Sequence, residues 1–291
     1  MIELVVISGK GGTGKTTVVG ALAALARDKV IADCDVDAPD LHLLLRPKAE
    51  KTVSYEGSKL AEIDVGFCIG CGTCLEACRF DAVLPVGNKF RIDPLSCEGC
   101  GACAHACPVG AIELRPRLSG WIHVSRTPYG TLVHGELLPG EGASGKLVTQ
   151  VKMRARELGR LEGAKLLLVD GAPGIGCPVI ASLSGAHAAV VVTEPSLAAL
   201  HDLARVIGVA RHFRVRTYVV INKADLAADV AERIEGFARG QGLSVLGRIP
   251  YDEGVIEAQV AGQPVVDRST AVAQVLRSIW DRLSQELDLR A

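Results

Sequence analysis

The sequence predicts an α/β fold in which helices flank a mostly parallel sheet, with a smaller α+β domain inserted into it. Two observations lead to this prediction. Short apolar segments rich in β-branched residues alternate with helical patterns along most of the chain, which is typical of βαβ units. Residues 64–113 break this alternation with eight cysteines and little helical or strand periodicity. We therefore expect a larger domain at 1–62 and 115–291 and an inserted domain at 63–114.

The elements of the larger domain follow from the periodicity of the apolar residues. Strands are expected at Leu4–Ile7, Val30–Ala32, Leu166–Val169, Ala189–Val192, Thr217–Ile221 and Ser244–Leu246. Helices are expected at Gly14–Ala26, Lys146–Leu158, Leu197–His212, Ala228–Ala238 and Thr270–Leu287. Between Trp121 and Ser144, short alternating runs bounded by Pro and Gly predict a hairpin that returns to the sheet.

The composition limits the kinds of partner. The net charge is -1 and aromatic residues make up 4% of the chain, so neither electrostatics nor base stacking favours nucleic acid. The apolar runs are far shorter than the roughly 20 residues that span a bilayer. The last expected helix carries charges of both signs, whereas a membrane-surface helix is rich in Lys and Arg. We expect a cytoplasmic protein with no nucleic-acid and no membrane partner.

A glycine-rich loop follows the first expected strand. Residues 9–16, GKGGTGKT, fit the phosphate-loop pattern G-x-x-x-x-G-K-[ST] and precede an expected helix. In such a loop, backbone N–H groups and the helix N-terminus surround phosphate oxygens. The pattern assigns Lys15 to the β- and γ-phosphates and the Thr16 hydroxyl to Mg²⁺. The expected nucleotide contacts are Gly9, Lys10, Gly11, Gly12, Thr13, Gly14, Lys15, Thr16 and Thr17.

A second lysine, Lys10, makes this loop more specific, because the loop also matches K-G-G-x-G-K-[ST]. The chain thereby resembles the deviant P-loop ATPases: MinD-type site-placing ATPases, plasmid-partition ATPases, Mrp-type cluster carriers and the nitrogenase iron protein. The resemblance implies a slow, partner-stimulated ATPase in which ATP closes a homodimer, or a heterodimer with a related ATPase. In that family the lysine equivalent to Lys10 reaches the nucleotide of the second subunit, so Lys10 and Lys15 are expected to act together in catalysis.

Three later segments extend the resemblance. In IADCDVDAP (31–39), where the family has switch I, Asp35 is expected to orient the attacking water. In LLLVDGAPGIG, Asp170 is expected in the outer shell of Mg²⁺ and is followed by the glycine-rich switch II. The family's base-binding segments are matched by VVINKAD (219–225) and IPYDE (249–253). Asn222, Asp225 and Pro250 are therefore expected to contact the base of the nucleotide. Asn-Lys-x-Asp is also the guanine-reading motif of GTPases, but the loop signature favours ATP.

The cysteines form an internal repeat. The run C-x2-C-x2-C-x3-C occurs twice, and each cysteine recurs 29 positions later, which indicates a duplicated half-module. This is the spacing of bacterial two-cluster ferredoxins, in which the fourth cysteine of each run ligates the other cluster. One 4Fe–4S cluster is expected on Cys68, Cys71, Cys74 and Cys107, and the second on Cys97, Cys100, Cys103 and Cys78.

Zinc held by four thiolates is the alternative, but two runs of three evenly spaced cysteines and a fourth fit cubane clusters better. The whole chain is similar to MinD-superfamily ATPases that carry an inserted bacterial-type ferredoxin domain. The sequence departs from the ferredoxin pattern at Arg79, because the residue after the fourth cysteine of such a run is usually Pro. Cys177 lies at the offset of a bridging-cluster cysteine in the nitrogenase iron protein, but the resemblance places Ala143 at the second bridging position. This argues against a bridging cluster and leaves the roles of Cys34 and Cys177 open.

These features together predict an ATP-hydrolysing iron–sulfur protein. Its nucleotide-driven dimerisation would be coupled to electron transfer, or to metallocluster delivery, to an acceptor protein. One alternative is a scaffold or carrier ATPase that assembles iron–sulfur or other metal–sulfur clusters. A second alternative is a positioning or partition ATPase whose clusters are structural.

Overall fold

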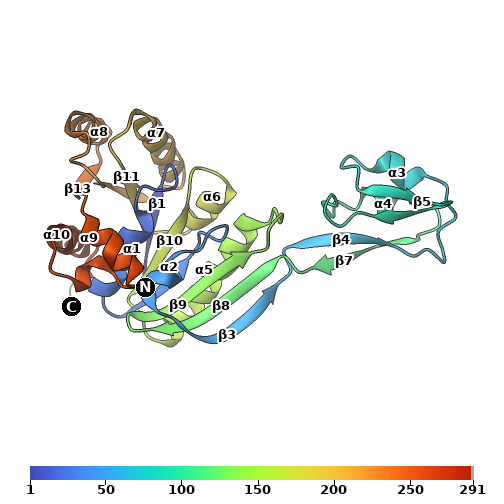
Figure 1. Ribbon diagram of the computed structural model, residues 1–291, viewed down its shortest axis with the longest axis horizontal. Coiled ribbons are helices and arrows are strands. Elements are labelled where there is room, and N and C mark those ends of the chain that lie inside the picture. Colours follow the sequence, from blue (N-terminus) through green and yellow to red (C-terminus); the bar gives the residue numbers. More distant parts are fainter. Residues whose placement is uncertain (290–291) are drawn as a thin grey trace. The chain divides into compact units, whose positions relative to one another are not determined.

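The computed structural model describes residues 1–289, which fold into two compact units (Figure 1). Unit 1 contains Met1–Val53, Ile122–Glu136 and the chain from Ser144 onward, and unit 2 contains Ser54–Trp121 and Leu137–Ala143. Each unit has its own hydrophobic core. Unit 2 is longer than the 63–114 segment that the cysteines suggest, because strands on both sides of the cysteine runs belong to it. The last two residues of the expected 115–291 segment lie outside the described residues.

A nine-stranded sheet forms the centre of unit 1, in the order β13-β12-β11-β1-β10-β2-β9-β8-β3. Its strands are β1 (Ile2–Ser8), β2 (Lys29–Asp33), β3 (Lys48–Tyr55), β8 (Gly120–Thr127), β9 (Gly130–Leu137), β10 (Leu166–Pro173), β11 (Ala188–Thr193), β12 (Arg216–Ile221) and β13 (Ser244–Arg248). From β13 to β9 all neighbours pair in parallel, so the predicted α/β fold with a mostly parallel sheet is confirmed. The predicted hairpin is also present, as β8 and β9.

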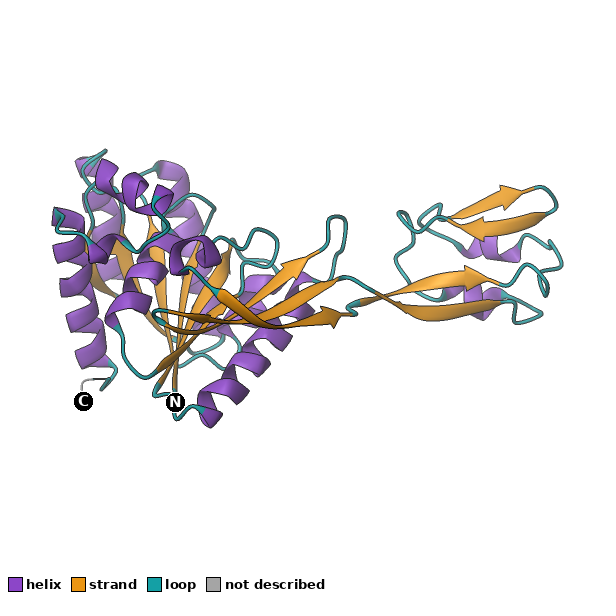
Figure 2. Ribbon diagram, turned by 60° about the horizontal axis from the view of Figure 1, so that its bottom comes forward, coloured by secondary structure: helices purple, strands orange, loops and turns teal. Residues whose placement is uncertain are grey.

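Helices cover both faces of this sheet (Figure 2). They are α1 (Lys15–Leu25), α2 (Leu41–Leu45), α5 (Ser144–Leu161), α6 (Cys177–Leu183), α7 (Leu197–His212), α8 (Ala228–Gly240), α9 (Glu253–Val260) and α10 (Ala271–Glu286). Leu4 and Val6 of β1 face α1 and α10, whereas α5 and α6 pack on the opposite face. The central strands β1, β10 and β11 are buried on both faces and are therefore mostly apolar, which is why they were visible in the sequence. Within residues 1–289, no helix is long and apolar enough to cross a membrane.

Unit 2 is a duplicated strand–helix–strand motif. Its elements are β4 (Ser58–Ile63), α3 (Thr73–Ala77), β5 (Val83–Val86), β6 (Lys89–Ile92), α4 (Ala102–Ala106) and β7 (Ile112–Arg117). The first strand of each half pairs in antiparallel fashion with the last strand of the other, β4 with β7 and β6 with β5. Equivalent backbone bonds join the halves, from Asp64 N to Ala111 O and from Asp93 N to Ala82 O. The 29-residue repeat therefore folds into two halves that complete each other.

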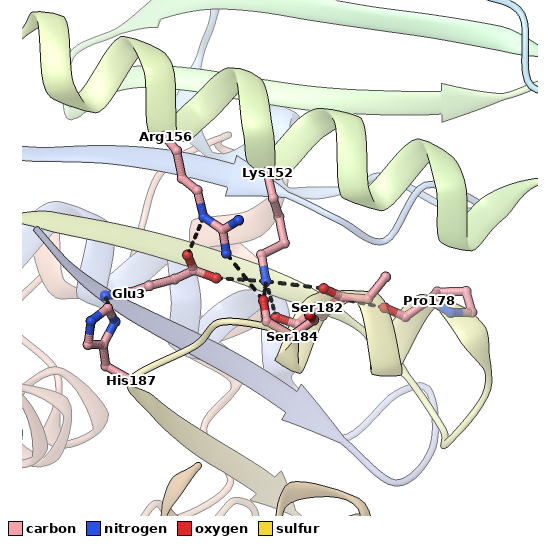
Figure 3. A network of polar contacts seen from close by, with 8 residues as sticks. Glu3, Lys152, Arg156, Pro178, Ser182, Ser184 and His187 are labelled. Atoms are coloured by element: carbon pink, nitrogen blue, oxygen red, sulfur yellow. Dashed lines mark hydrogen bonds and ion pairs between the residues drawn. The ribbon is translucent and has the colours of Figure 1, made fainter. Parts of the chain in front are cut away.

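A buried polar network ties β1 to helices α5 and α6 (Figure 3). Glu3, on β1, lies 2.7 Å from Lys152 Nζ through one carboxylate oxygen and 2.7 Å from Arg156 Nε through the other. Lys152 also donates to the carbonyls of Ala181 and Ser184 at the C-terminal end of α6. Burial lowers the pKa of Lys152, and the adjacent Glu3 carboxylate opposes that effect. The network fixes α6, the helix after switch II, to α5.

Removal of Lys152 should destabilise unit 1. Lys152→Ala is expected to lower the free energy of unfolding by about 3 kcal/mol, because it removes one partner of a buried carboxylate. Urea unfolding followed by circular dichroism measures the change. Lys165→Ala removes a half-exposed lysine instead and should change the free energy by about 0.5 kcal/mol or less. A loss below about 1 kcal/mol for Lys152→Ala would mean that Arg156 alone satisfies Glu3.

Candidate functional site

The phosphate loop connects β1 to the first turn of α1. Gly12 and Gly14 have φ angles of 77° and 87°, which side chains rarely tolerate. A Cβ atom on Gly14 would lie 2.1 Å from Asn222 Nδ2, so glycine is required there for space as well. The Asn222 amide in turn donates to the Thr13 carbonyl at 2.8 Å. Asn222, which was predicted to contact the nucleotide base, thus also stabilises the conformation of the phosphate loop.

A cavity of about 660 Å³ opens beside the loop at the carboxyl ends of the parallel strands, a usual place and size for a ligand in such sheets. Of the residues predicted from the sequence, those that line it are Gly11, Gly12, Gly14, Lys15, Thr16, Thr17, Asp35, Asn222 and Pro250. The other lining residues were not predicted as contacts, and they include Tyr251, Ile256 and Gln259. Gln259 donates to the Thr17 hydroxyl at 2.9 Å, which joins α9 to the start of α1.

Several predicted nucleotide contacts lie outside the cavity lining. Gly9 packs against Asp202, where a Cβ atom would come within 2.5 Å of the Asp202 Cβ. Thr13 is buried. The Asp225 carboxylate accepts a hydrogen bond from the Tyr251 backbone N–H at 2.7 Å.

Lys15 forms a buried charge cluster with two acidic residues. Its Nζ lies 2.5 Å from Asp170 Oδ1 and 3.5 Å from Asp35 Oδ2. Burial by itself would lower the pKa of Lys15, but the charges of Asp170 and Asp35 outweigh burial and raise it. Lys15 therefore stays charged. Burial raises the pKa of Asp35, and the Lys15 ammonium opposes that effect.

The residues predicted to bind Mg²⁺ fit a magnesium ion with its water shell. Asp170 is 1% exposed, and its second oxygen, Oδ2, has no hydrogen-bond partner among the described residues. A buried, unpaired carboxylate oxygen suits a water molecule on Mg²⁺, which keeps several of its waters when bound. Thr16 lines the same cavity, where its hydroxyl can serve as a direct ligand.

The second loop lysine is held by a residue that sequence analysis missed. Lys10 Nζ lies 2.6 Å from Glu194 Oε1, and Lys10 is absent from the lining of the nucleotide cavity. Glu194 directly follows β11 and is 184 residues away in the chain. No local pattern could have revealed this contact, because it depends on β1 and β11 being neighbours in the sheet.

The eight clustered cysteines surround two cavities in unit 2. The first cavity is lined by Cys68, Cys71, Cys74 and Cys107 with apolar neighbours. The second is lined by Cys97, Cys100, Cys103 and Cys78. The structure thus groups the cysteines in the same two crossed sets that the ferredoxin spacing suggests. Among the described residues, no three His, Cys, Asp or Glu side chains are arranged to hold a single metal ion.

Glycines shape the chain around both cavities. Gly70 and Gly99 occupy equivalent positions of the repeat, with φ angles of 75° and 63°. A Cβ atom on Gly70 would lie 2.2 Å from the Asn88 carbonyl oxygen, and one on Gly99 would lie 2.1 Å from the Lys59 carbonyl oxygen. Asn88 and Lys59 are themselves 29 residues apart. Each cysteine loop therefore presses against the backbone of the other half, and only glycine fits.

The two remaining cysteines lie beside the switch segments. Cys34 is fully buried, and its backbone N–H donates to the Asp170 carbonyl at 2.7 Å. Burial raises the pKa of the Cys34 thiol, which keeps it protonated and unreactive. Cys177 is exposed at the first position of α6. Ala143, its expected counterpart, belongs to unit 2 and accepts a hydrogen bond from the Tyr55 hydroxyl.

The parallel sheet, the phosphate loop and the buried Lys15–Asp170 pair define a P-loop nucleotide-binding protein. The sequence matches the CobQ/CobB/MinD/ParA nucleotide-binding domain over residues 4–265, and the chain belongs to that family. It is therefore a P-loop ATPase of the MinD/ParA class.

Relatives and solved structures agree with this assignment. An uncharacterized protein of Methanocaldococcus jannaschii is 32% identical over 98% of this chain and 97% of its own length. An iron-sulfur cluster carrier protein of Pyrococcus abyssi is 24% identical over 98% of this chain and 86% of its own length. The septum site-determining protein MinD of Pyrococcus horikoshii, solved with Mg-ADP, has the same fold, with a TM-score of 0.62 at 16% identity over 100% of this chain and 98% of that chain.

Loss of the Asp170 charge should impair the magnesium site. Asp170→Asn is expected to lower ATPase activity or apparent Mg²⁺ affinity by about 10- to 100-fold, because an amide holds the waters of Mg²⁺ less strongly than a carboxylate. Magnesium titration of the steady-state ATPase rate measures both quantities. Asp229→Asn, which removes an exposed carboxylate on α8, should leave both unchanged. Wild-type magnesium dependence in Asp170→Asn would contradict the assignment.

Proposed function

We propose that the protein is an ATP-driven redox protein, in which two 4Fe–4S clusters in unit 2 exchange electrons with a partner and the ATPase unit controls that exchange. One observation carries the proposal: a chain with a complete P-loop site also arranges eight cysteines around two cavities, four to each. Four thiolates around one apolar cavity are the ligands of a cubane cluster. Each such cluster accepts and donates one electron when bound.

The cysteine environment supports the fit of a cluster at each cavity. Cys74 and Cys103 are 7% and 8% exposed, so one ligand of each set lies in the hydrophobic core of unit 2. The Ala111 backbone N–H donates to Cys107 Sγ at 3.3 Å, and such bonds to ligand sulfurs tune a cluster's potential. The chain's own contribution is a largely apolar lining in which one cysteine of each set is buried, whereas Cys71 and Cys100 remain exposed.

On the ATPase side, we propose that ATP closes a dimer. Lys15 and the loop N–H groups bind the phosphates, Thr16 and Asp170 hold Mg²⁺ and its water shell, and Asp35 orients the attacking water. Lys10 reaches the nucleotide of the second subunit. Two observations support the last role: Lys10 does not line its own nucleotide cavity, and its ammonium is partly exposed. The second subunit is a further copy of this chain or a related ATPase.

A cluster carrier is the second candidate, and the likeness to the Pyrococcus abyssi carrier protein favours it. A carrier must release its clusters. Incubation of the iron-loaded protein with an apo-ferredoxin would therefore transfer iron to the apo-ferredoxin within minutes, and ATP would speed up this transfer. A redox protein keeps its iron through the same incubation. Positioning ATPases with structural clusters form a third class, which predicts nucleotide-dependent binding to DNA or to lipid vesicles.

The crossed assignment of the cysteines can be tested by iron content and spectroscopy. Anaerobically purified wild-type protein should hold about eight irons per chain, and Cys107→Ala should hold about four. The remaining EPR signal of Cys107→Ala should match that of Cys74→Ala, because both variants lose the first cluster. Cys103→Ala should lose the second cluster and keep the EPR signal of the first. If Cys107→Ala instead matches Cys103→Ala, each run of cysteines binds its own cluster.

Coupling between ATP and the clusters can be tested by redox titration. MgATP is expected to shift at least one cluster potential of the wild-type protein by about 60 mV, equivalent to a tenfold change for one electron. Lys15→Ala, which loses the phosphate contact, should show no shift but the same potential without nucleotide. EPR-monitored titrations with MgATP, with MgADP and without nucleotide make the comparison. Identical potentials in all wild-type samples would overturn the redox proposal.

A further inference from the structure

The side chain of Lys10 is turned away from the nucleotide of its own subunit. Its Nζ lies 2.6 Å from Glu194 Oε1, in an ion pair whose side chains are 35% and 21% exposed. Lys15 and Lys223 line the nucleotide cavity, whereas Lys10 and Glu194 are not among its lining residues. A lysine held in this way cannot reach a second subunit's nucleotide until the pair breaks.

The backbone around Glu194 is held by hydrogen bonds. It occupies the turn between β11 and α7, where the preceding Thr193 carbonyl accepts from Asn222 N at 2.8 Å. Its own carbonyl accepts from Ser196 N at 2.8 Å, and the Ser196 hydroxyl caps α7. Lys10, in contrast, has a long side chain on a loop. We therefore expect a change of partner to move the long Lys10 side chain more than the shorter Glu194 side chain.

A second lysine keeps the carboxylate paired after such a change. Lys223 Nζ lies 3.4 Å from Glu194 Oε2 and donates to the Gly12 carbonyl at 3.1 Å. Burial alone would raise the pKa of Glu194, but the two lysines lower it, so the carboxylate is ionised. Departure of Lys10 therefore does not leave a buried charge unpaired, and the release is less costly than breaking an isolated buried pair.

We propose that Glu194 is a positioning residue that holds Lys10 within its own subunit and thereby sets the ATP concentration at which two subunits associate. This inference rests on the proposed role of Lys10 across the dimer. In the free subunit Glu194 neutralises Lys10. In the dimer the phosphates of the second subunit replace Glu194, and Lys223 remains as the partner of the carboxylate. Glu194 thus competes with the partner's nucleotide for one ammonium group.

The test is the ATP dependence of dimerisation in Glu194→Gln. The amide cannot compete for the ammonium as a carboxylate does, so half-maximal dimerisation is expected at an ATP concentration about threefold lower or more. Sedimentation with a non-hydrolysable ATP analogue measures it. Binding of ADP to the monomer should change less than twofold, because Glu194 does not line the cavity. Glu157→Gln, which breaks an exposed ion pair with Arg154 on α5, is the matched control and should behave as wild type.

Lys10→Ala separates the two proposals. If Lys10→Ala dimerises like the wild type, the proposed role of Lys10 across the dimer fails. If Lys10→Ala no longer dimerises but Glu194→Gln keeps the wild-type ATP dependence, only the role of Glu194 fails. Should Glu194→Gln be unstable, Glu194→Asp shortens the side chain by one methylene and predicts the same direction of change. A rise in the required ATP concentration in either variant would overturn the inference.

Discussion

The buried ion pair between Lys15 and Asp170 is the interaction on which the nucleotide site depends. Lys15 begins α1 and Asp170 lies on β10, and both are almost completely buried. A single unpaired charge at this depth costs several kcal/mol, so the helix start and the strand end are held together. Asp35 lies 3.5 Å from the same ammonium. We expect entry of a phosphate to draw Lys15 from both carboxylates, which releases Asp170 to Mg²⁺ and changes the electrostatic environment of switch I.

Unit 2 obeys a different constraint, namely that neither half of the repeat is complete alone. β4 finds its partner in β7 and β5 finds its partner in β6, so half a module would leave unpaired strand edges. Cys107 joins the first cavity from the second half, and Cys78 joins the second cavity from the first half. Each cavity is therefore completed by cysteines from both halves of the unit.

The parts of the fold that the sequence predicted are those with a local cause. Both faces of the parallel strands are buried, so the strands are apolar runs, and the phosphate loop needs glycine at fixed positions. β3 could not be predicted, because nearly all of its residues are exposed and it lacks apolar alternation. The five-residue helix α2 is too short to show a period.

Contacts between distant segments were equally invisible in the sequence. Three histidines that are separated in the sequence meet in the fold, where His42 and His123 each stack on His134. Burial, together with the two neighbouring rings, lowers the pKa of His134 to about 4. Tyr251 and Gln259 reach the nucleotide cavity only because the chain after β13 returns to it. Pairing of Lys10 with Glu194 depends in the same way on strand order.

Chain connectivity joins unit 2 to the segment that follows switch I. Switch I leads through α2 and β3 directly into unit 2, and unit 2 ends at Ala143, one residue before α5 begins. Lys152 of α5 binds the carbonyls at the end of α6, and α6 begins directly after switch II. Switch I is therefore followed by a covalent entry to unit 2, whereas switch II lies after unit 2 and α5 in the chain, and the helix that follows it is tied to α5 by the Lys152 contacts. The buried Glu3–Lys152 network makes movement of α5 relative to β1 costly.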